Sequence, residues 1–165
     1  MINSKLDATD IAILSELQCN GRIKNVELAE KISLSPSPCL KRVKRLEKMG
    51  LIEGYGAKIA INQLINTIQI LTQFSLTIDT LENHQKFELM IIECPEVMEC
   101  LMGSGGFDYM VKFVCSSIEH YQQTIKKLLN TELEISKYTS YVVMKEIVSR
   151  SNYPLESLLL SEKSP

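Results

Sequence analysis

Residues 25–50, NVELAEKISLSPSPCLKRVKRLEKMG, decide the fold expected for the first third of the chain. Apolar residues recur at helical spacing in 26–32, and the turn Ser33-Leu34-Ser35 separates them from a second helical run over 36–49. Asn25 and Ser35 are suitable N-caps for these two helices, and Gly50 is suited to end the second. Two helices joined by a three-residue turn predict a helix-turn-helix.

The second helix, residues 36–49, is expected to carry its positive charges on one face. On a helical wheel at about 100° per residue, the basic side chains and Ser37 share one arc, and only Glu47 intrudes on the opposite apolar arc. An α-helix fits the major groove of B-form DNA, and its first turn usually points at base edges. A solvated charged face would give the same pattern. The candidate DNA contacts are Arg22, Lys24, Asn25, Ser35, Ser37, Lys41, Arg42, Lys44, Arg45 and Lys48.

The charge of the chain is unevenly placed. Residues 1–60 carry ten Lys/Arg against seven Asp/Glu, a net +3, whereas the other 105 residues carry eight against thirteen, a net −5. Such an asymmetry favours a polyanion-binding module joined to a module with another task. The five cysteines form no C-x-x-C and no zinc-ligand spacing with the two histidines, which predicts reduced thiols and no metal.

The rest of the chain divides at changes in pattern. Asp7 is a suitable N-cap with Asp10 three residues on, which predicts a helix before the helix-turn-helix. We expect a DNA-binding domain over 1–53, a linker strand over 54–65, a second domain over 66–150 and a tail over 151–165 with a short helix. No secretory segment and no apolar run of about 18 residues are seen, so we expect a cytoplasmic protein with no membrane partner.

The second domain is expected to alternate strands and helices. Residues 67–78 alternate apolar and polar side chains with period two, and Thr72 is the exception on the apolar face. Ser116 and Glu119 form a candidate capping box for the second helix. The expected elements are a strand at 67–78, a helix at 81–93, strands at 97–102 and 107–115, a helix at 118–129 and a strand at 138–148. This order predicts an α+β fold with a ferredoxin-like βαββαβ domain.

The expected sheet has helices on one face only. The strands 97–102 and 138–148 are apolar on both faces, which is typical of strands covered on both sides. A second copy of the domain would cover the free face by sheet-on-sheet packing, which predicts a two-fold homodimer. Alternatively, the helix of the tail could fold over that face.

Three segments carry a family resemblance. Residues 6–55, the hairpin GSGGFDYMVK at 103–112 and the strand YVVMKEI at 141–147 resemble the leucine-responsive regulatory protein (Lrp/AsnC) family of bacterial and archaeal transcription regulators. The resemblance implies a winged-helix-type DNA-binding domain, an effector domain, a homodimer and an octamer of four dimers. It also implies a free amino acid as effector, bound between protomers. Carried over by position, the effector site comprises Gly103, Ser104, Gly105, Asp108, Tyr141 and Val142.

The resemblance leaves the effector and the competing functions open. The family often has a carboxylate after the second glycine of the hairpin, where this chain has Gly106. We expect a cytoplasmic, nucleoid-associated regulator of double-stranded DNA without catalytic residues or cofactor. One alternative is a tetrapyrrole enzyme of the same architecture, although His84 and His120 are expected on solvated helix faces. The other is an effector sensor that does not bind DNA.

Overall fold

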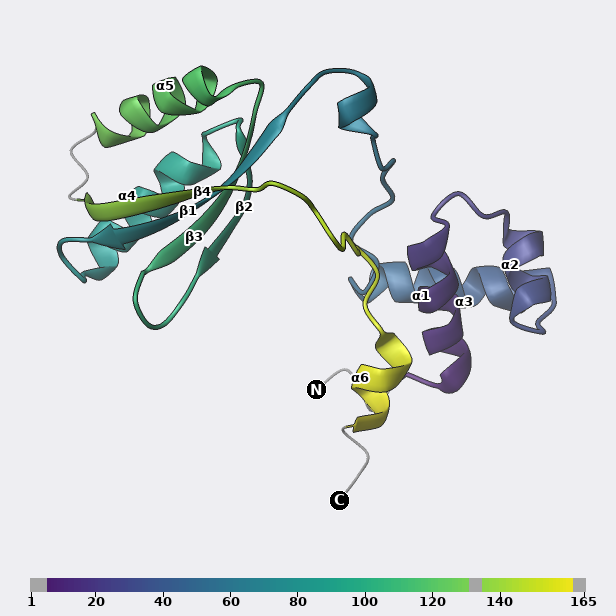
Figure 1. Ribbon diagram of the computed structural model, residues 1–165. Helices are drawn as coiled ribbons and strands as arrows, with labels where there is room; N and C mark the ends of the chain where they lie inside the picture. The colour runs from purple at the N-terminus through teal and green to yellow at the C-terminus, as the bar shows by residue number, and fades with distance from the viewer. Residues whose placement is uncertain (1–5, 131–134, 162–165) are drawn as a thin grey trace. The chain divides into compact units, whose positions relative to one another are not determined.

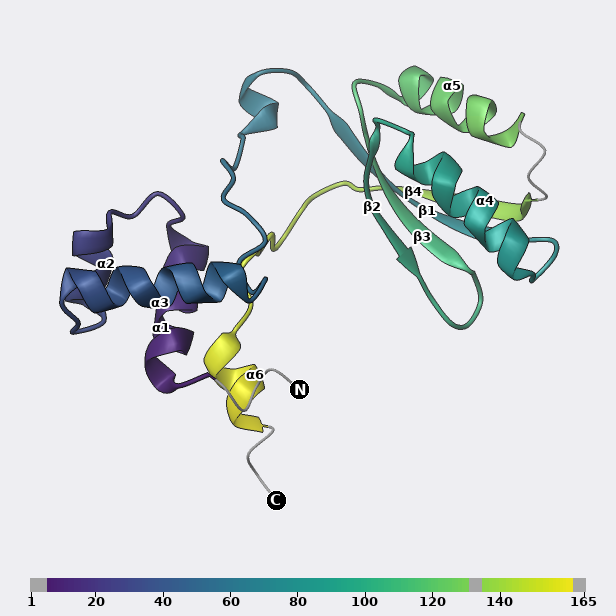
Figure 2. The ribbon, with the colours of Figure 1, turned by 180° about the vertical axis from the view of Figure 1, so that it is seen from behind.

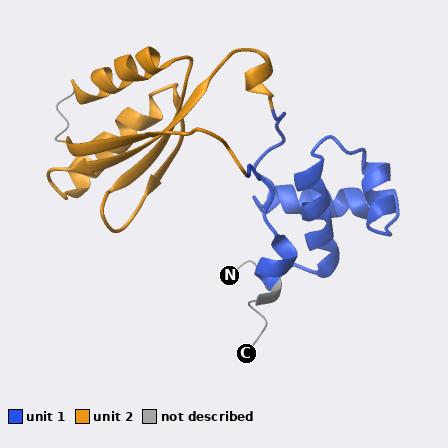
Figure 3. Cartoon of the chain, viewed as in Figure 1, with its two compact units in different colours: residues 1–58, 148–165 blue, residues 59–147 orange. Residues whose placement is uncertain are grey.

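The computed structural model describes residues 6–130 and 135–161. The chain divides into two compact units: unit 1 comprises residues 1–58 and 148–165, and unit 2 comprises residues 59–147 (Figure 3). The tail expected as a separate segment therefore clusters with unit 1. No described helix is long and apolar enough to cross a membrane.

Unit 1 contains the predicted helix-turn-helix (Figure 1). Its helices are α1 (Ala8–Cys19), α2 (Asn25–Lys31), α3 (Pro36–Lys48) and α6 (Leu155–Ser161). The helices α1–α3 bury one apolar cluster, and α3 contributes Cys39 and Leu46 to it while its charged side chains stay outside. The amphipathic wheel of residues 36–49 is thereby confirmed for Cys39 and Leu46, whereas Leu40 on the same apolar arc is exposed.

The turn between α2 and α3 is fixed by a side chain. Asn25 is the first residue of α2 and not its cap, since the N-cap position is Lys24 and makes no side-chain bond. Instead, Asn25 Nδ2 donates to the carbonyl oxygen of Pro36 at 2.8 Å. This bond ties the start of α2 to the start of α3.

The expected linker strand over 54–65 is wrong in its secondary structure. No strand is assigned between residues 51 and 60, all of which the structure describes, and a 3₁₀ helix, η2, covers Ile61–Gln63. A strand needs a partner for its hydrogen bonds, and the described part of the chain supplies none beside this segment.

Unit 2 has the predicted βαββαβ order. Its elements are β1 (Ile68–Leu76), α4 (Leu81–Ile92), β2 (Val97–Met102), β3 (Tyr109–Cys115), α5 (Ile118–Leu129) and β4 (Ile135–Val142). The four strands pair antiparallel in the order β2-β3-β1-β4. This α+β arrangement is the ferredoxin-like fold expected from the sequence.

Both helices of unit 2 cover the same face of the sheet (Figures 1 and 2). Phe74 and Phe113 from the strands pack with Phe87 of α4 and Tyr121 of α5 in one buried cluster. The exceptional Thr72 is buried because its hydroxyl bonds the Tyr121 hydroxyl at 2.7 Å. A buried hydroxyl with a partner is tolerated in an apolar core.

Two details of unit 2 differ from the prediction. The N-cap of α5 is Ser117, not Ser116, because the Ser117 side chain accepts from the backbone N–H of His120. The last strand begins at Ile135 and ends at Val142, although one further ladder bond joins the Val143 N–H to the Gln69 carbonyl. Among the described strands β4 pairs only with β1, and this pairing ends at Ile70 and Val142, two residues inside the start of β1 at Ile68.

The second face of the sheet carries neither α4 nor α5, the two helices described in unit 2. Its side chains alternate with the buried ones and include apolar groups on four strands: Leu71, Leu101, Met110, Val114 and Tyr141. The tail helix does not provide the cover considered as an alternative, because α6 clusters with unit 1, where it packs on α1.

Candidate DNA interface and effector site

The exposed face of α3 presents three lysines. Lys41, Lys44 and Lys48 are all exposed, and within the described residues none has a carboxylate at ion-pair distance. Ser37 is exposed on the same face, in the first turn of the helix. The three lysines are therefore available to a polyanion without breaking an ion pair between described residues.

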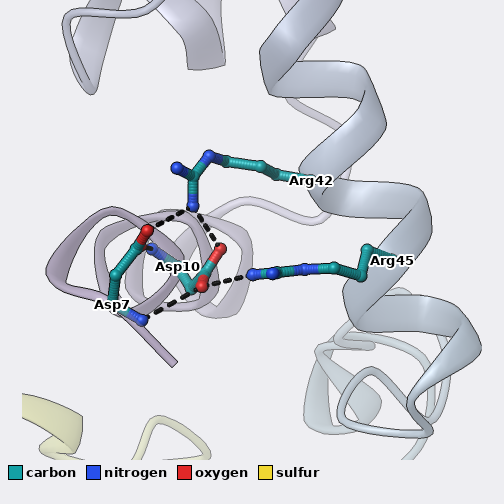
Figure 4. A network of polar contacts seen from close by, with 4 residues as sticks. All are labelled: Asp7, Asp10, Arg42 and Arg45. Atoms are coloured by element: carbon teal, nitrogen blue, oxygen red, sulfur yellow. Dashed lines mark hydrogen bonds and ion pairs between the residues drawn. The ribbon is translucent and has the colours of Figure 1, made fainter. Parts of the chain in front are cut away.

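The two arginines of α3 are in a different situation (Figure 4). Arg42 Nη1 donates to Asp7 Oδ2 at 2.7 Å and to Asp10 Oδ1 at 2.9 Å, and Arg45 Nη2 pairs with Asp10 Oδ2. Asp10 is fully buried, and it also accepts from the backbone N–H of Asp7. The carboxylates therefore serve twice, because the same pair forms the capping box that starts α1.

This network has an electrostatic consequence for the helix terminus. The hydrogen bond from Arg42, followed by that from the Asp10 backbone N–H, holds the pKa of Asp7 below its ordinary value. Two of the five positive charges of α3 are thus partly neutralised by α1. The Arg42 side chain is 31% exposed and that of Arg45 is 46% exposed, so Arg45 keeps more of its surface for an external anion.

The remaining predicted DNA contacts lie around the helix-turn-helix. Arg22 and Lys24 are exposed just before α2, whereas Asn25 is half-buried and engaged with Pro36. Ser35 is exposed at the N-cap of α3 and makes no side-chain cap bond. The structure therefore leaves its hydroxyl available to a partner.

Glu47, which the wheel placed in the apolar arc, has a defined role. Its Oε1 accepts from the hydroxyl of Tyr55 at 2.9 Å. Burial, and then this bond, raises the pKa of Tyr55 to about 12. The Tyr55 ring also lies close to Gly21, where an added Cβ would be 3.2 Å from Tyr55 Cδ1. The segment after α3 is thereby held against the end of α1 and the end of α3.

The predicted effector hairpin connects β2 to β3. Gly105 has φ +133°, a conformation that side chains rarely adopt, and an added Cβ at Gly103 would be 3.0 Å from the ring of Phe107. Ser104 is exposed at the turn. Asp108 Oδ2 accepts from the backbone N–H of Leu76 at 2.7 Å. Asp108 is therefore a structural acceptor between β1 and β3, and not simply an outward strand residue.

The other half of the predicted site lies elsewhere on the sheet. Tyr141 is opposite Leu71 and Val142 is opposite Ile70, whereas the hairpin joins β3 at Tyr109, which is opposite Phe74. At 3.4 Å per residue, three to four residues separate these positions by about 10–14 Å along β1. They also belong to strands on opposite sides of β1. One protomer therefore does not bring the six residues together.

Sequence reasoning missed two groups of polar residues, one around the buried His84 and one around the buried Asp10. His84 is buried, contrary to the expected solvated face: its Nδ1 is 2.8 Å from the Tyr109 hydroxyl and its Nε2 is 2.9 Å from Asp79 Oδ1. Tyr109 in turn donates to Glu88 at 2.9 Å, and burial raises its pKa strongly. The other missed group is the Asp7 and Asp10 pair, whose spacing signalled a cap but not its arginine partners.

The two units match two family models. Residues 6–53 match the model for winged helix-turn-helix DNA-binding domains, and residues 69–153 match the model for the Lrp/AsnC ligand binding domain. The chain is 42% identical to the transcriptional regulatory protein DoeX of Halomonas elongata over 143 residues, 87% of this chain and 90% of that protein. It is 40% identical to the leucine-responsive regulatory protein of Haemophilus influenzae over 149 residues, 88% and 87% of the two chains.

Solved structures agree with the sequence comparisons. A transcriptional regulator from Neisseria meningitidis, crystallised as an L-Met complex, superposes with a TM-score of 0.86 at 33% identity, over 93% of this chain and 99% of that one. An AsnC family regulator from Agrobacterium tumefaciens gives a TM-score of 0.87 at 26% identity, with the same coverage. With a DNA-binding helix-turn-helix, a ferredoxin-like ligand-binding unit and these relatives, the chain belongs to the Lrp/AsnC family of transcriptional regulators.

Proposed function

We propose that this regulator contacts DNA through Ser37, Lys41, Lys44 and Lys48 of α3, and that Arg42 is a structural residue. The observation that carries the proposal is the division of the α3 cations. The three lysines are exposed without carboxylate partners in the described residues, whereas Arg42 is held by Asp7 and Asp10. An unpaired cation gives its full charge to a phosphate, and each such contact contributes to the salt dependence of binding.

The test compares lysine and arginine variants by the salt dependence of DNA binding. The full chain is titrated with a labelled mixed-sequence duplex, and the logarithm of affinity is plotted against the logarithm of salt concentration. Lys41→Ala and Lys44→Ala should each reduce the slope by about 0.9 per protomer bound. Arg42→Ala should leave the slope unchanged, with circular dichroism showing that the variant is folded. Equal slopes for wild type and the double lysine variant would contradict the proposal.

We also propose a free amino acid as effector, bound at a site that two protomers complete. The hairpin offers backbone N–H groups at a glycine turn, which suit a ligand carboxylate. Asp108 Oδ1 has no hydrogen-bond partner within the described residues and suits the ligand ammonium group. Tyr141 and Val142 lie about 10–14 Å further along the sheet, so we propose that a second copy supplies them.

Asp108→Asn tests this effector site. Asparagine keeps an oxygen for the Leu76 N–H and removes only the charge that would bind an ammonium group. In a thermal-shift screen of the twenty amino acids, at least one should stabilise the wild type at millimolar concentration. Asp108→Asn should unfold at the wild-type temperature without ligand and lose most of the shift. Absence of any shift in the wild type would remove the support for an amino-acid effector.

The free face of the sheet supports a homodimer. Its apolar side chains would be covered by the same face of a second copy, as in two-layer sheet packing. We propose that such dimers further associate into an octamer, and that the assembly acts in the cytoplasm on nucleoid DNA. The molar mass in solution, measured by light scattering, distinguishes dimer from octamer.

A further inference from the structure

Unit 1 contains a cleft that the helix-turn-helix does not require. It has a volume of about 720 Å³ and lies between the end of α1, residues 20–22, residues 56–58 and residues 149–152. All of these segments belong to unit 1. The cleft is therefore formed where the tail of the chain returns to the DNA-binding unit.

The lining of the cleft is basic. Arg22, Lys58 and Arg150 line it from three separate segments, and the described lining residues include no Asp or Glu. All three cations are exposed, and within the described residues none of them has an ion-pair partner. Three uncompensated charges around one concave surface favour an anionic occupant.

The segments that carry these cations are held in place by hydrogen bonds. Tyr153 donates its backbone N–H to Gln18 Oε1 at 2.8 Å, and Gln18 Nε2 donates back to the Tyr153 carbonyl at 3.3 Å. Asn152 Nδ2 lies 3.4 Å from Cys19 Sγ. On the other wall, the contacts of Tyr55 with Glu47 and Gly21 position the chain just before Lys58.

The position of Arg22 indicates which anion the cleft meets. Arg22 lies directly before α2, the first helix of the helix-turn-helix, and this helix crosses the DNA backbone in such motifs. The cleft is thus continuous with the predicted DNA-contacting surface. Phosphate oxygens are the usual partners of arginine and lysine at this position, and such contacts set orientation without reading sequence.

We propose that this cleft binds phosphate groups of the DNA backbone, so that Lys58 and the tail residue Arg150 extend the DNA interface beyond the helix-turn-helix. The inference rests on the DNA-binding function of α3 and adds partners from outside the domain that residues 6–53 define. It gives the tail a direct part in DNA affinity.

The experiment measures salt slopes for cleft variants of the full chain with the same mixed-sequence duplex. Lys58→Ala and Arg150→Ala should each lower the slope by about 0.9 per protomer bound and weaken binding about eightfold at 0.1 M salt. Lys127→Ala, an exposed lysine on α5 in unit 2, is the matched control and should leave slope and affinity unchanged.

The outcomes separate this proposal from the proposal for α3. If Lys41→Ala lowers the slope but Lys58→Ala and Arg150→Ala do not, the cleft does not contact DNA and the α3 interface stands. If Lys41→Ala has no effect, the α3 interface fails whatever the cleft variants do.

A free phosphorylated compound is the other source of phosphate groups. Inorganic pyrophosphate is added to the wild type and to Arg150→Ala, and the unfolding temperature is measured. No shift at millimolar pyrophosphate is expected, because the cleft is open and a DNA strand supplies several phosphates at once. A shift that Arg150→Ala abolishes, together with unchanged DNA slopes, would overturn the assignment to DNA.

Discussion

The two units differ in whether one chain brings all residues of the predicted site together. In unit 1, the predicted recognition helix α3 packs on helices of the same chain, and its three lysines are already exposed. In unit 2, the predicted effector residues are divided between the β2–β3 hairpin and β4, and one face of the sheet carries no helix of the unit. The comparison teaches that local periodicity can specify a helix-turn-helix, whereas a site shared between copies needs the assembly.

A charge introduced on the free face of the sheet should have the largest effect, and the effect should be on the oligomeric state. Leu71→Lys places a second positive charge beside Lys112, which is opposite Leu71 on β3. Two like charges enclosed in an interface are strongly unfavourable, so we expect the proposed dimer to dissociate at micromolar concentration. Analytical ultracentrifugation should show the mass of one chain. The control is Leu89→Lys at an exposed site on α4, for which the dimer should persist.

Removing Asp10 should have the next largest effect, a loss of the folding stability of unit 1. Asp10→Ala deletes the capping-box acceptor and the buried partner of Arg42 and Arg45, a loss of about 2–3 kcal/mol of stability. Urea unfolding followed by circular dichroism measures the loss. Stability within about 0.5 kcal/mol of wild type would show that the ion pairs of Asp10 with Arg42 and Arg45 do not stabilise the fold.

The hairpin of unit 2 offers a matched pair of glycines. Gly105→Ala should destabilise unit 2 by about 1–2 kcal/mol, because its φ of +133° is strained for any side chain. Gly106 has no such φ and no atom within 4 Å of an added Cβ, so Gly106→Ala should change stability by less than about 0.5 kcal/mol. Denaturant unfolding compares the two variants. Equal losses would mean that the backbone at Gly105 does not set the hairpin.

The smallest expected effect concerns pH. Because the pKa of Asp7 is lowered in the folded state, its stabilisation is complete above about pH 4, its unfolded range, and is lost as the pH falls through the lowered folded value. Asp7→Asn should therefore flatten the stability of unit 1 below about pH 4. Unfolding by urea across this range measures the change, with Glu53→Gln as a control that should retain the wild-type slope.

The sequence predicted where helices form better than it predicted which residues cap them or pair with them. The bounds of α5, 118–129, were predicted to the residue because its apolar spacing is regular. The predicted cap was wrong by one residue, Ser116 in place of Ser117, because either serine can accept the same kind of hydrogen bond. The strand at 138–148 was placed too late in the chain because its bounds depend on which residues pair with β1, and its own apolar run does not show that pairing.

The site residues show the same limit. The wheel placed Lys41, Lys44 and Lys48 on an outward face, and they are exposed. It could not show that Arg42 meets Asp7 and Asp10, which are more than thirty residues earlier in the chain. Their pattern identified a cap, because capping is local, whereas an ion pair across helices depends on how they pack.

The division of the chain into units has a consequence for motion. Unit 2 is an insertion between two parts of unit 1, since the chain leaves unit 1 after residue 58 and re-enters it at residue 148. Two covalent crossings, rather than one, therefore join the sheet to the DNA-reading helices. Any bending between the two units must therefore change the backbone at both crossings together, near residue 58 and near residue 148.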